Sequence, residues 1–351
     1  MAREGTPSMP QGLFHYCTYF DQHYLTRGLA LYRSLEAHSR PFRLWVLCMD
    51  EVVYAILKQL ALPEIEPITL AAFEQGDGAL LEAKQQRSLV EYYFTCTPSL
   101  PLYILTHQPE VERITYLDAD LFFFSDPAPL FAEVGEHSIA IIAHRFPADL
   151  RHRERAGIYN VGWLSFRRDE HGLACLHWWR ARCLEWCYDR EEPERFADQK
   201  YLDDWPERFQ KVLVVRHPGA NLAPWNLRNY QLTQGADGTI LVDGKPLIFF
   251  HFHGLKRVNR WLYIHGLGNY RTRSSRLLRQ AIYRPYVQLL TSIPHDLAVI
   301  AVEHVRSVGT IRYTKLPVVV QQRQMRGLLR WLRTMAATGK GLLSGAYIFV
   351  S

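Results

Sequence analysis

The sequence predicts an α/β protein built on a doubly wound mixed sheet. Strand-like apolar runs alternate with runs of helical spacing through the first third of the 351-residue chain, as is typical of such sheets. Leu25, Leu29, Tyr32 and Leu35 show the helical spacing. Ligands of doubly wound sheets bind at the carboxyl ends of the strands, and two aspartates directly follow one predicted strand.

The expected elements are spread over the first 252 residues. Strands are predicted where short buried-type runs occur, and helices where apolar residues recur every three or four positions. The predicted strands are 14–18, 43–48, 65–70, 113–117, 138–143, 161–166, 212–215 and 247–252. The predicted helices are 26–38, 52–60, 99–107 and 173–188.

Composition restricts the class of protein. Hydrophobic residues make up 48% and charged residues 22%, which is typical of a folded globular protein. The polar first residues and the lack of about 20 consecutive apolar residues predict neither a secretory signal nor a membrane span. The six cysteines show no C-x-x-C spacing, which favours buried thiols in a reducing compartment. We therefore expect a cytoplasmic enzyme.

Charge is divided unevenly along the chain. Residues 244–351 carry 17 Lys and Arg against two acids, a net charge of +15, which leaves −9 for residues 1–243 because the whole chain carries +6. We expect a catalytic domain over 1–265 and a basic, mostly helical extension over 266–351. Within 321–336, arginines and apolar residues recur at helical spacing. This pattern predicts either a helix on an anionic membrane surface or a helix that docks on the acidic part of the chain.

A pair of carboxylates is the first candidate site. Asp118 and Asp120 lie between the apolar runs 114–117 and 121–124. Buried carboxylates need a compensating partner, and a hard divalent cation that bridges to a diphosphate would provide one. The alternative is a strand end where one aspartate caps a helix and the other faces water.

Three further segments carry polar groups of the right chemistry. His251 and His253 precede Gly254, Lys256 and Arg257, which suggests a metal ligand beside a phosphate-binding turn, although a lone His is commonly a core residue. Carboxylate and amide side chains suit sugar hydroxyls. They occur at Asp198 and Gln199, where helix capping is the alternative, and at Asn160, where a simple turn residue is the alternative.

Together and in this order, the segments resemble glycosyltransferase family eight, which includes glycogenin and the lipopolysaccharide galactosyltransferases. Four motifs carry the resemblance, and a fifth segment looks like the family's opening strand and turn. The motifs are Tyr116-Leu117-Asp118-Ala119-Asp120, Asn160-Val161-Gly162, Asp198-Gln199 and His251-Phe252-His253-Gly254, and the opening segment is Tyr19-Phe20-Asp21-Gln22-His23-Tyr24. The resemblance covers roughly residues 14–257 and not the basic extension.

The resemblance implies a GT-A fold with a Rossmann-like nucleotide-binding half, a nucleotide-diphosphate sugar donor, Mn²⁺ or Mg²⁺, and retention of anomeric configuration. It implies a glycan or lipid-linked acceptor and no nucleic acid partner. By similarity the metal ligands are Asp118, Asp120 and His251, and the catalytic residues are Asp198 and Gln199. The donor-binding residues are Thr18, Tyr19, Asp21, Arg87, Asp118, Asn160, Gly254, Lys256 and Arg257.

Two other classes compete with this interpretation. A sugar-nucleotide pyrophosphorylase can share the sheet, but its Gly-rich basic N-terminal loop has no counterpart, since 14–24 contains no glycine. A non-catalytic basic binding protein is compatible with the charge of the extension, but the chain has no helix-turn-helix, zinc-finger or RNA-binding signature. The sequence therefore favours a metal-dependent glycosyltransferase of the hexosyltransferase type.

Overall fold

The computed structural model describes residues 12–259, 262–294 and 347–349, which form two compact units, Met1–His253 and Gly254–Ser351. Each unit is described by itself. The division into domains at 265/266 stays a prediction. The predicted amphipathic helix at 321–336 lies outside the described residues.

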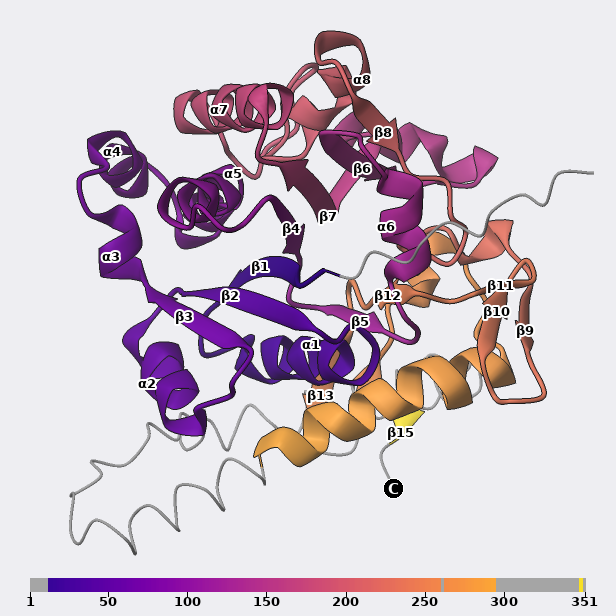
Figure 1. Ribbon diagram of the computed structural model, residues 1–351. Helices are drawn as coiled ribbons and strands as arrows, with labels where there is room; N and C mark the ends of the chain where they lie inside the picture. The colour runs from indigo at the N-terminus through magenta and orange to yellow at the C-terminus, as the bar shows by residue number, and fades with distance from the viewer. Residues whose placement is uncertain (1–11, 260–261, 295–346, 350–351) are drawn as a thin grey trace, which may run out of the picture. The chain divides into compact units, whose positions relative to one another are not determined.

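The first unit is built on a seven-stranded sheet with the order β3-β2-β1-β4-β7-β6-β8 (Figure 1). Four of the six strand pairs are parallel, and β7 runs antiparallel to both of its neighbours. The predicted mixed α/β sheet is therefore confirmed. The strands are β1 Phe14–Phe20, β2 Phe42–Cys48, β3 Ile65–Thr69, β4 Arg113–Leu117, β6 Ile139–Ala143, β7 Tyr159–Arg167 and β8 Val212–Val214.

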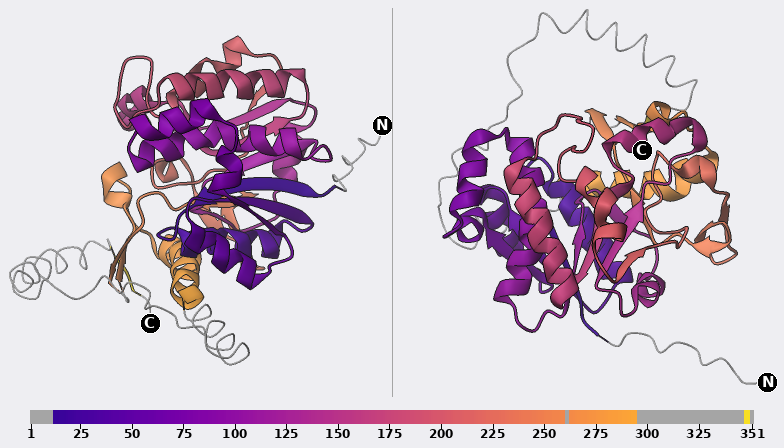
Figure 2. Two further views of the ribbon diagram at one scale, coloured as in Figure 1. Left: turned by 90° about the vertical axis from the view of Figure 1, so that its left-hand side faces the viewer. Right: turned by 90° about the horizontal axis from the view of Figure 1, so that it is seen from above.

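Helices cover both faces of this sheet. Figures 1 and 2 show α1 (Leu25–His38) and α2 (Glu51–Leu60) on one side, with α5 (Leu89–His107) and α7 (Glu170–Glu185) packed together on the other. The shorter helices are α3 Leu70–Glu74, α4 Gly78–Gln86, α6 Ala128–Val134 and α8 Trp205–Arg208, with 3₁₀ helices at η1 Ala148–Ala156, η2 Lys200–Asp204 and η3 Leu227–Asn229.

Two helices begin earlier than the sequence predicts, and capping explains both. α5 begins at Leu89 rather than at 99, because Ser88 and Glu91 form a reciprocal capping box and Pro98 and Pro101 are accommodated inside the helix. α7 begins at Glu170 rather than at 173, because the Asp169 carboxylate accepts from the Gly172 amide at 2.9 Å.

Aromatic side chains fill the space between the sheet and α7. Phe166, Trp179 and Trp205 are all fully buried in one cluster, and the Trp179 and Trp205 rings meet edge-to-face with centroids 5.2 Å apart. All six cysteines are buried free thiols, as the sequence predicts. Among the residues that the structure describes, no helix is long and apolar enough to span a bilayer.

Two small sheets complete the first unit. β5 (Leu121–Phe123) pairs antiparallel with β12 (Phe249–His251), which is shorter than the strand predicted at 247–252. β9 (Leu232–Gln234), β10 (Ile240–Val242) and β11 (Lys245–Pro246) form an antiparallel sheet.

The second unit contains a three-stranded antiparallel sheet, a short 3₁₀ turn and a helix over 276–294 (Figure 1). Its strands are β13 Lys256–Asn259, β14 Leu262–Ile264 and β15 Tyr347–Phe349. Its helical segments include η4 Leu267–Tyr270 and the π-helical η5 Leu278–Tyr283.

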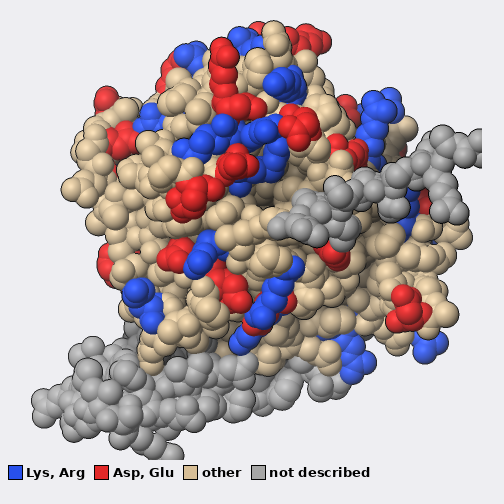
Figure 3. All heavy atoms as spheres, viewed as in Figure 1, with Lys and Arg blue, Asp and Glu red and all other residues tan. Residues whose placement is uncertain are grey.

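Charged side chains of both signs share the described surface. On the face in Figure 3, Lys and Arg lie among Asp and Glu. Several of them pair across elements, as Arg180 does with Asp77 and Arg228 with Asp149. Both pairs join residues within the first 243, so they leave the net charge of that part at −9.

Candidate metal centre

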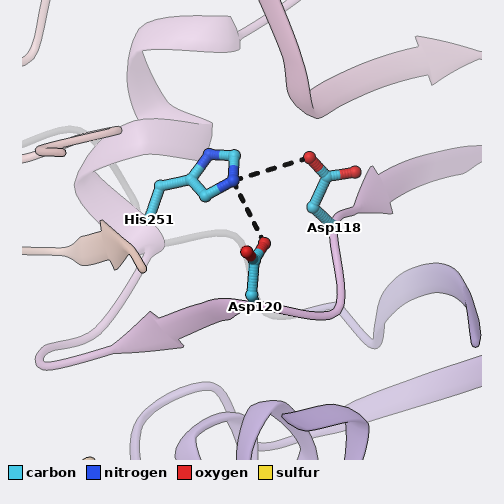
Figure 4. A group of neighbouring side chains, drawn as sticks. All are labelled: Asp118, Asp120 and His251. Carbon is cyan, nitrogen blue, oxygen red and sulfur yellow. Dashed lines mark ion pairs between the residues drawn. The ribbon is translucent and has the colours of Figure 1, made fainter. Parts of the chain in front are cut away.

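Three side chains from different segments converge at the carboxyl edge of the sheet. Asp118 directly follows β4, Asp120 directly precedes β5, and His251 is the last residue of β12 (Figure 4). The Nε2 of His251 lies 3.1 Å from an oxygen of Asp120 and 3.7 Å from an oxygen of Asp118. One ligand atom from each residue lies within 4.8 Å of the others, so together they could hold a metal ion.

The backbone fixes these three residues in place. The Asp118 amide donates to the Gly162 carbonyl at 2.9 Å, which ties the first aspartate to β7. The Phe252 amide donates to the Asp120 carbonyl at 3.0 Å, which extends the pairing between β12 and β5. The triad is therefore positioned by strand pairing and not by mobile loops.

At the triad, burial and the charges of neighbouring residues shift the pKa of each side chain in opposite directions. Burial would raise the pKa of Asp120, but the adjacent His251 imidazole outweighs burial and lowers it to about 2. Burial raises the pKa of Asp118, which the charge of His251 opposes. Burial alone would lower the pKa of His251, but the carboxylate of Asp120 raises it instead. Asp118 and Asp120 keep 30% and 15% of their side chains exposed, so an incoming cation can reach them.

The donor set fits a divalent cation. Carboxylate oxygens and one neutral imidazole suit Mn²⁺ or Mg²⁺ chemistry, with the imidazole favouring the transition metal. The structure places His251 rather than His253 in the triad. His253 lies beyond the end of β12 and is exposed, with its ring centroid 6.0 Å from that of His251.

Asn160 and Gln199 meet beside the triad. The Asn160 side-chain oxygen lies 3.2 Å from Nδ1 of His251, and its nitrogen lies 3.5 Å from the Gln199 oxygen. Gln199 also donates to the Ala156 carbonyl at 3.0 Å. The alternative interpretation of Asn160 as a simple turn residue is wrong, because Asn160 lies within β7 and its side chain contacts His251.

Asp198 is buried, with 5% of its surface exposed. Burial raises the pKa of its carboxyl to about 7; a hydrogen bond with Thr97 opposes that effect, and the charge of Asp118 adds to it. Its backbone follows Ala197, a left-handed residue with φ 47°. Helix capping does not explain Asp198, since the cap of η2 is Gln199 and makes no side-chain capping bond.

The opening segment lies at the carboxyl end of β1, next to β4 in the sheet. Thr18 is fully buried, and its hydroxyl has no hydrogen-bond partner among the described residues. The Tyr19 hydroxyl lies 3.1 Å from that of Thr97. The carboxylate of Asp21 accepts from the amides of His23 and Tyr24, at 3.0 and 3.2 Å.

The remaining donor-binding candidates, Arg87, Gly254, Lys256 and Arg257, do not belong to the opening segment. Arg87 donates to the Thr95 hydroxyl and, at 2.7 Å, to the Leu184 carbonyl. Arg87 therefore links the N-terminal half of α5 to the C-terminal end of α7. Gly254, Lys256 and Arg257 belong to the second unit. Gly254 has a left-handed φ of 75°, and the two basic residues are exposed on β13. Phosphate binding by these residues stays a prediction.

The segment 217–229 contributes to the site and was not predicted from the sequence. The Leu222 carbonyl accepts from the His251 amide at 2.8 Å, and the buried Trp225 ring packs edge-to-face on the His251 imidazole with centroids 5.1 Å apart. Arg145 donates to the His217 and Ala220 carbonyls and so braces this segment. The segment has no strand or helix periodicity, so only its Pro-Trp-Asn run could have drawn attention to it.

Comparison with known proteins gives close relatives by sequence and a more distant one by structure. No family model matches the chain. The uncharacterised protein YfnF of Bacillus subtilis (strain 168) is 35% identical over 251 residues, which cover 70% of this chain and 82% of YfnF. YfnD of the same strain is 34% identical over 248 residues, which cover 70% of this chain and 79% of YfnD. The chain belongs to the family of YfnF and YfnD.

The fold of this YfnF/YfnD family member is that of GT-A glycosyltransferases. The galactosyltransferase LgtC, solved in complex with donor and acceptor sugar analogues, superposes with a TM-score of 0.51 at 15% identity. The match covers 80% of this chain and 96% of LgtC. At this identity the comparison establishes the fold and leaves the activity to be argued from the site.

Proposed function

We propose that the protein is a metal-dependent glycosyltransferase of family-eight type that moves a sugar from a nucleotide-diphosphate donor to a glycan or lipid-linked acceptor. The observation that carries the proposal is the convergence of Asp118, Asp120 and His251 at the carboxyl edge of a GT-A sheet. The cation is Mn²⁺ or Mg²⁺, and bound there it would neutralise charge that develops on the leaving nucleotide diphosphate.

Asp198 and Gln199 act on the transferred sugar in this proposal. Burial raises the pKa of Asp198 to about 7, so near neutral pH its carboxyl can either donate to or accept from a sugar hydroxyl. Gln199 contacts Asn160, which supports a shared sugar-binding role for the two amides. We propose retention of configuration, with these residues on the face of the sugar opposite the acceptor.

The donor's nucleotide part contacts the carboxyl end of β1 in this proposal. The Thr18 hydroxyl, which has no hydrogen-bond partner among the described residues, supports a base and ribose site there together with Tyr19 and Asp21. Arg87 supplies a cationic group for the diphosphate in this proposal. Phosphate binding by Gly254, Lys256 and Arg257 of the second unit stays a prediction from the sequence. The basic composition of 266–351 supports a peripheral position on the inner face of a membrane, which sedimentation with anionic liposomes tests.

A screen of nucleotide sugars tests the function. The full-length protein is incubated with each donor and Mn²⁺, and both donor hydrolysis and the thermal midpoint Tm are measured. We expect one donor to be hydrolysed only with metal and to raise the Tm by mass action. Asp120→Asn is the matched control and should lose both effects. Stabilisation by no donor, with or without metal, would contradict the proposal.

A further inference from the structure

A chain of three buried side chains leads from the metal centre into the protein. His251, Asn160 and His144 are 3%, 7% and 7% exposed. Asn160 connects the other two, since its oxygen lies 3.2 Å from Nδ1 of His251 and its nitrogen lies 3.4 Å from Nε2 of His144. His144 follows β6 directly and was not singled out from the sequence.

The hydrogen-bond partners of His144 define where its proton lies. Its Nδ1 lies 3.1 Å from the Ile158 carbonyl, which can only accept, so Nδ1 carries the proton. Burial lowers the pKa of His144 to about 3, so the ring is neutral. Its Nε2 therefore presents a lone pair to the Asn160 amide.

The Asn160 amide can adopt only one orientation in this setting. Its nitrogen donates to Nε2 of His144 and to the Gln199 oxygen, and its oxygen accepts from the Gly162 amide at 3.3 Å. A flipped amide would set its NH₂ against the Gly162 N–H, donor against donor, and would leave the lone pair of His144 facing an oxygen. The amide oxygen is therefore directed at Nδ1 of His251.

Because that oxygen accepts, Nδ1 of His251 must donate, and Nε2 of His251 is left to face the two carboxylates. We propose that His144 is a positioning residue that acts through Asn160 to direct Nε2 of His251 toward the metal. This inference rests on the metal site of the proposed function. Metal-binding histidines are commonly oriented by an acceptor on their second nitrogen, but here the acceptor is itself oriented by a second histidine.

The contacts of His144 hold its backbone and its ring in place, as a positioning role requires. Its backbone amide donates to the Ile158 carbonyl at 2.9 Å, and its own carbonyl accepts from the Asn226 side chain at 3.0 Å. Its ring stacks on Phe146 and meets Trp225, which also packs on His251. Trp225 thus contacts both imidazoles.

Two substitutions of His144 separate its two nitrogens. In His144→Asn the side-chain amide reaches only the position of Nδ1, so the Ile158 contact can persist while the contact with Asn160 is lost. In His144→Gln the longer side chain reaches the position of Nε2, where its oxygen can accept from Asn160. Both variants are polar and of similar size, so they are matched for burial.

Mn²⁺ affinity is measured by titration calorimetry on the full-length protein without any nucleotide sugar, and the Tm is measured in parallel. We expect His144→Asn to weaken Mn²⁺ binding about 10- to 100-fold. His144→Gln should stay within about threefold of the wild type, because its oxygen keeps the accepting contact with Asn160. Tyr16→Phe, which removes a buried hydrogen bond to Ser39, should lower the Tm and leave Mn²⁺ affinity unchanged.

The outcomes separate this inference from the proposed function. If the wild type binds no Mn²⁺, the assignment of the metal site is wrong, and the positioning role of His144 is overturned together with it. If the wild type binds Mn²⁺, Asp120→Asn does not, and His144→Asn binds like the wild type, only the positioning role is overturned. Equal weakening in both His144 variants with a matching loss of Tm also overturns it, because His144 would then only fill space.

Discussion

Replacing Gly162 by alanine tests the geometry of the site with one methyl group. A Cβ at this position would lie 2.8 Å from the Asn160 side-chain oxygen, 2.8 Å from Cε1 of His251 and 2.9 Å from its Nδ1. Ordinary contacts begin at 3.4 Å, so these atoms must retreat by about 0.6 Å. The substitution therefore displaces the metal ligand without removing any ligand atom.

The displacement predicts a loss of metal affinity larger than the loss of stability explains. Ligand distances tolerate about 0.2 Å, and disturbance of the groups around a ligand costs about 10- to 100-fold in affinity. Overpacking costs roughly 1–3 kcal/mol in the free energy of unfolding. Mn²⁺ titration and urea denaturation of Gly162→Ala measure the two effects separately.

Ile104→Val is a suitable control, because Ile104 is fully buried in α5 and the change costs about 0.5–1.5 kcal/mol. It should reduce stability and keep wild-type Mn²⁺ affinity. If Gly162→Ala bound Mn²⁺ as tightly as the wild type while carrying the expected stability loss, the close approach of His251 to Gly162 would not matter for metal binding.

Four further results are expected. Asp118→Asn and Asp120→Asn should each nearly abolish sugar transfer with an unchanged circular dichroism spectrum, and full activity without added metal would rule out the site. His251→Ala should lose Mn²⁺ binding and His253→Ala should keep it; the reverse would move the ligand to the exposed histidine. Mn²⁺ affinity should be constant above the raised pKa of His251 and fall about tenfold per pH unit below that pKa, because a proton competes with the metal for Nε2 at lower pH. A Mn²⁺ affinity that calorimetry finds independent of pH would contradict this prediction. Asp198→Asn should reduce turnover and raise the Tm at pH 8. An acid with a raised pKa stabilises the fold at low pH and loses that contribution as the pH rises through about 7. An unchanged Tm at pH 8 would refute the burial argument.

The sheet and the two aspartates could be predicted from the sequence because their signals are local. A strand of five residues, the last four of them buried, ends directly before Asp118, and β4 with its parallel neighbour β1 places that end at the ligand-binding edge. The choice between His251 and His253 could not be made from strand geometry, because residues two apart on a strand face the same way. The structure distinguishes them by the end of β12 at His251.

Contacts between distant segments could not be predicted from the sequence. Asn160 resembled a turn residue because its partners, His144, Gln199 and His251, come from three other segments. Thr97 and Asn226 carried no motif, and yet each contacts a residue at the site or beside it. The start of α5 is predicted ten residues late from the sequence, because that prediction does not use the capping box of Ser88 and Glu91.

The pairing of β12 with β5 makes metal binding a measure of completed folding. β5 follows the fourth strand of the main sheet along the chain, whereas β12 is added only after β6, β7 and β8. A chain that ends before Phe249 can form the parallel β3-β2-β1-β4 arrangement and still lack a metal ligand. Since a ligand stabilises only the states that bind it, added Mn²⁺ should favour forms in which β12 has docked and leave earlier, partly folded forms unaffected.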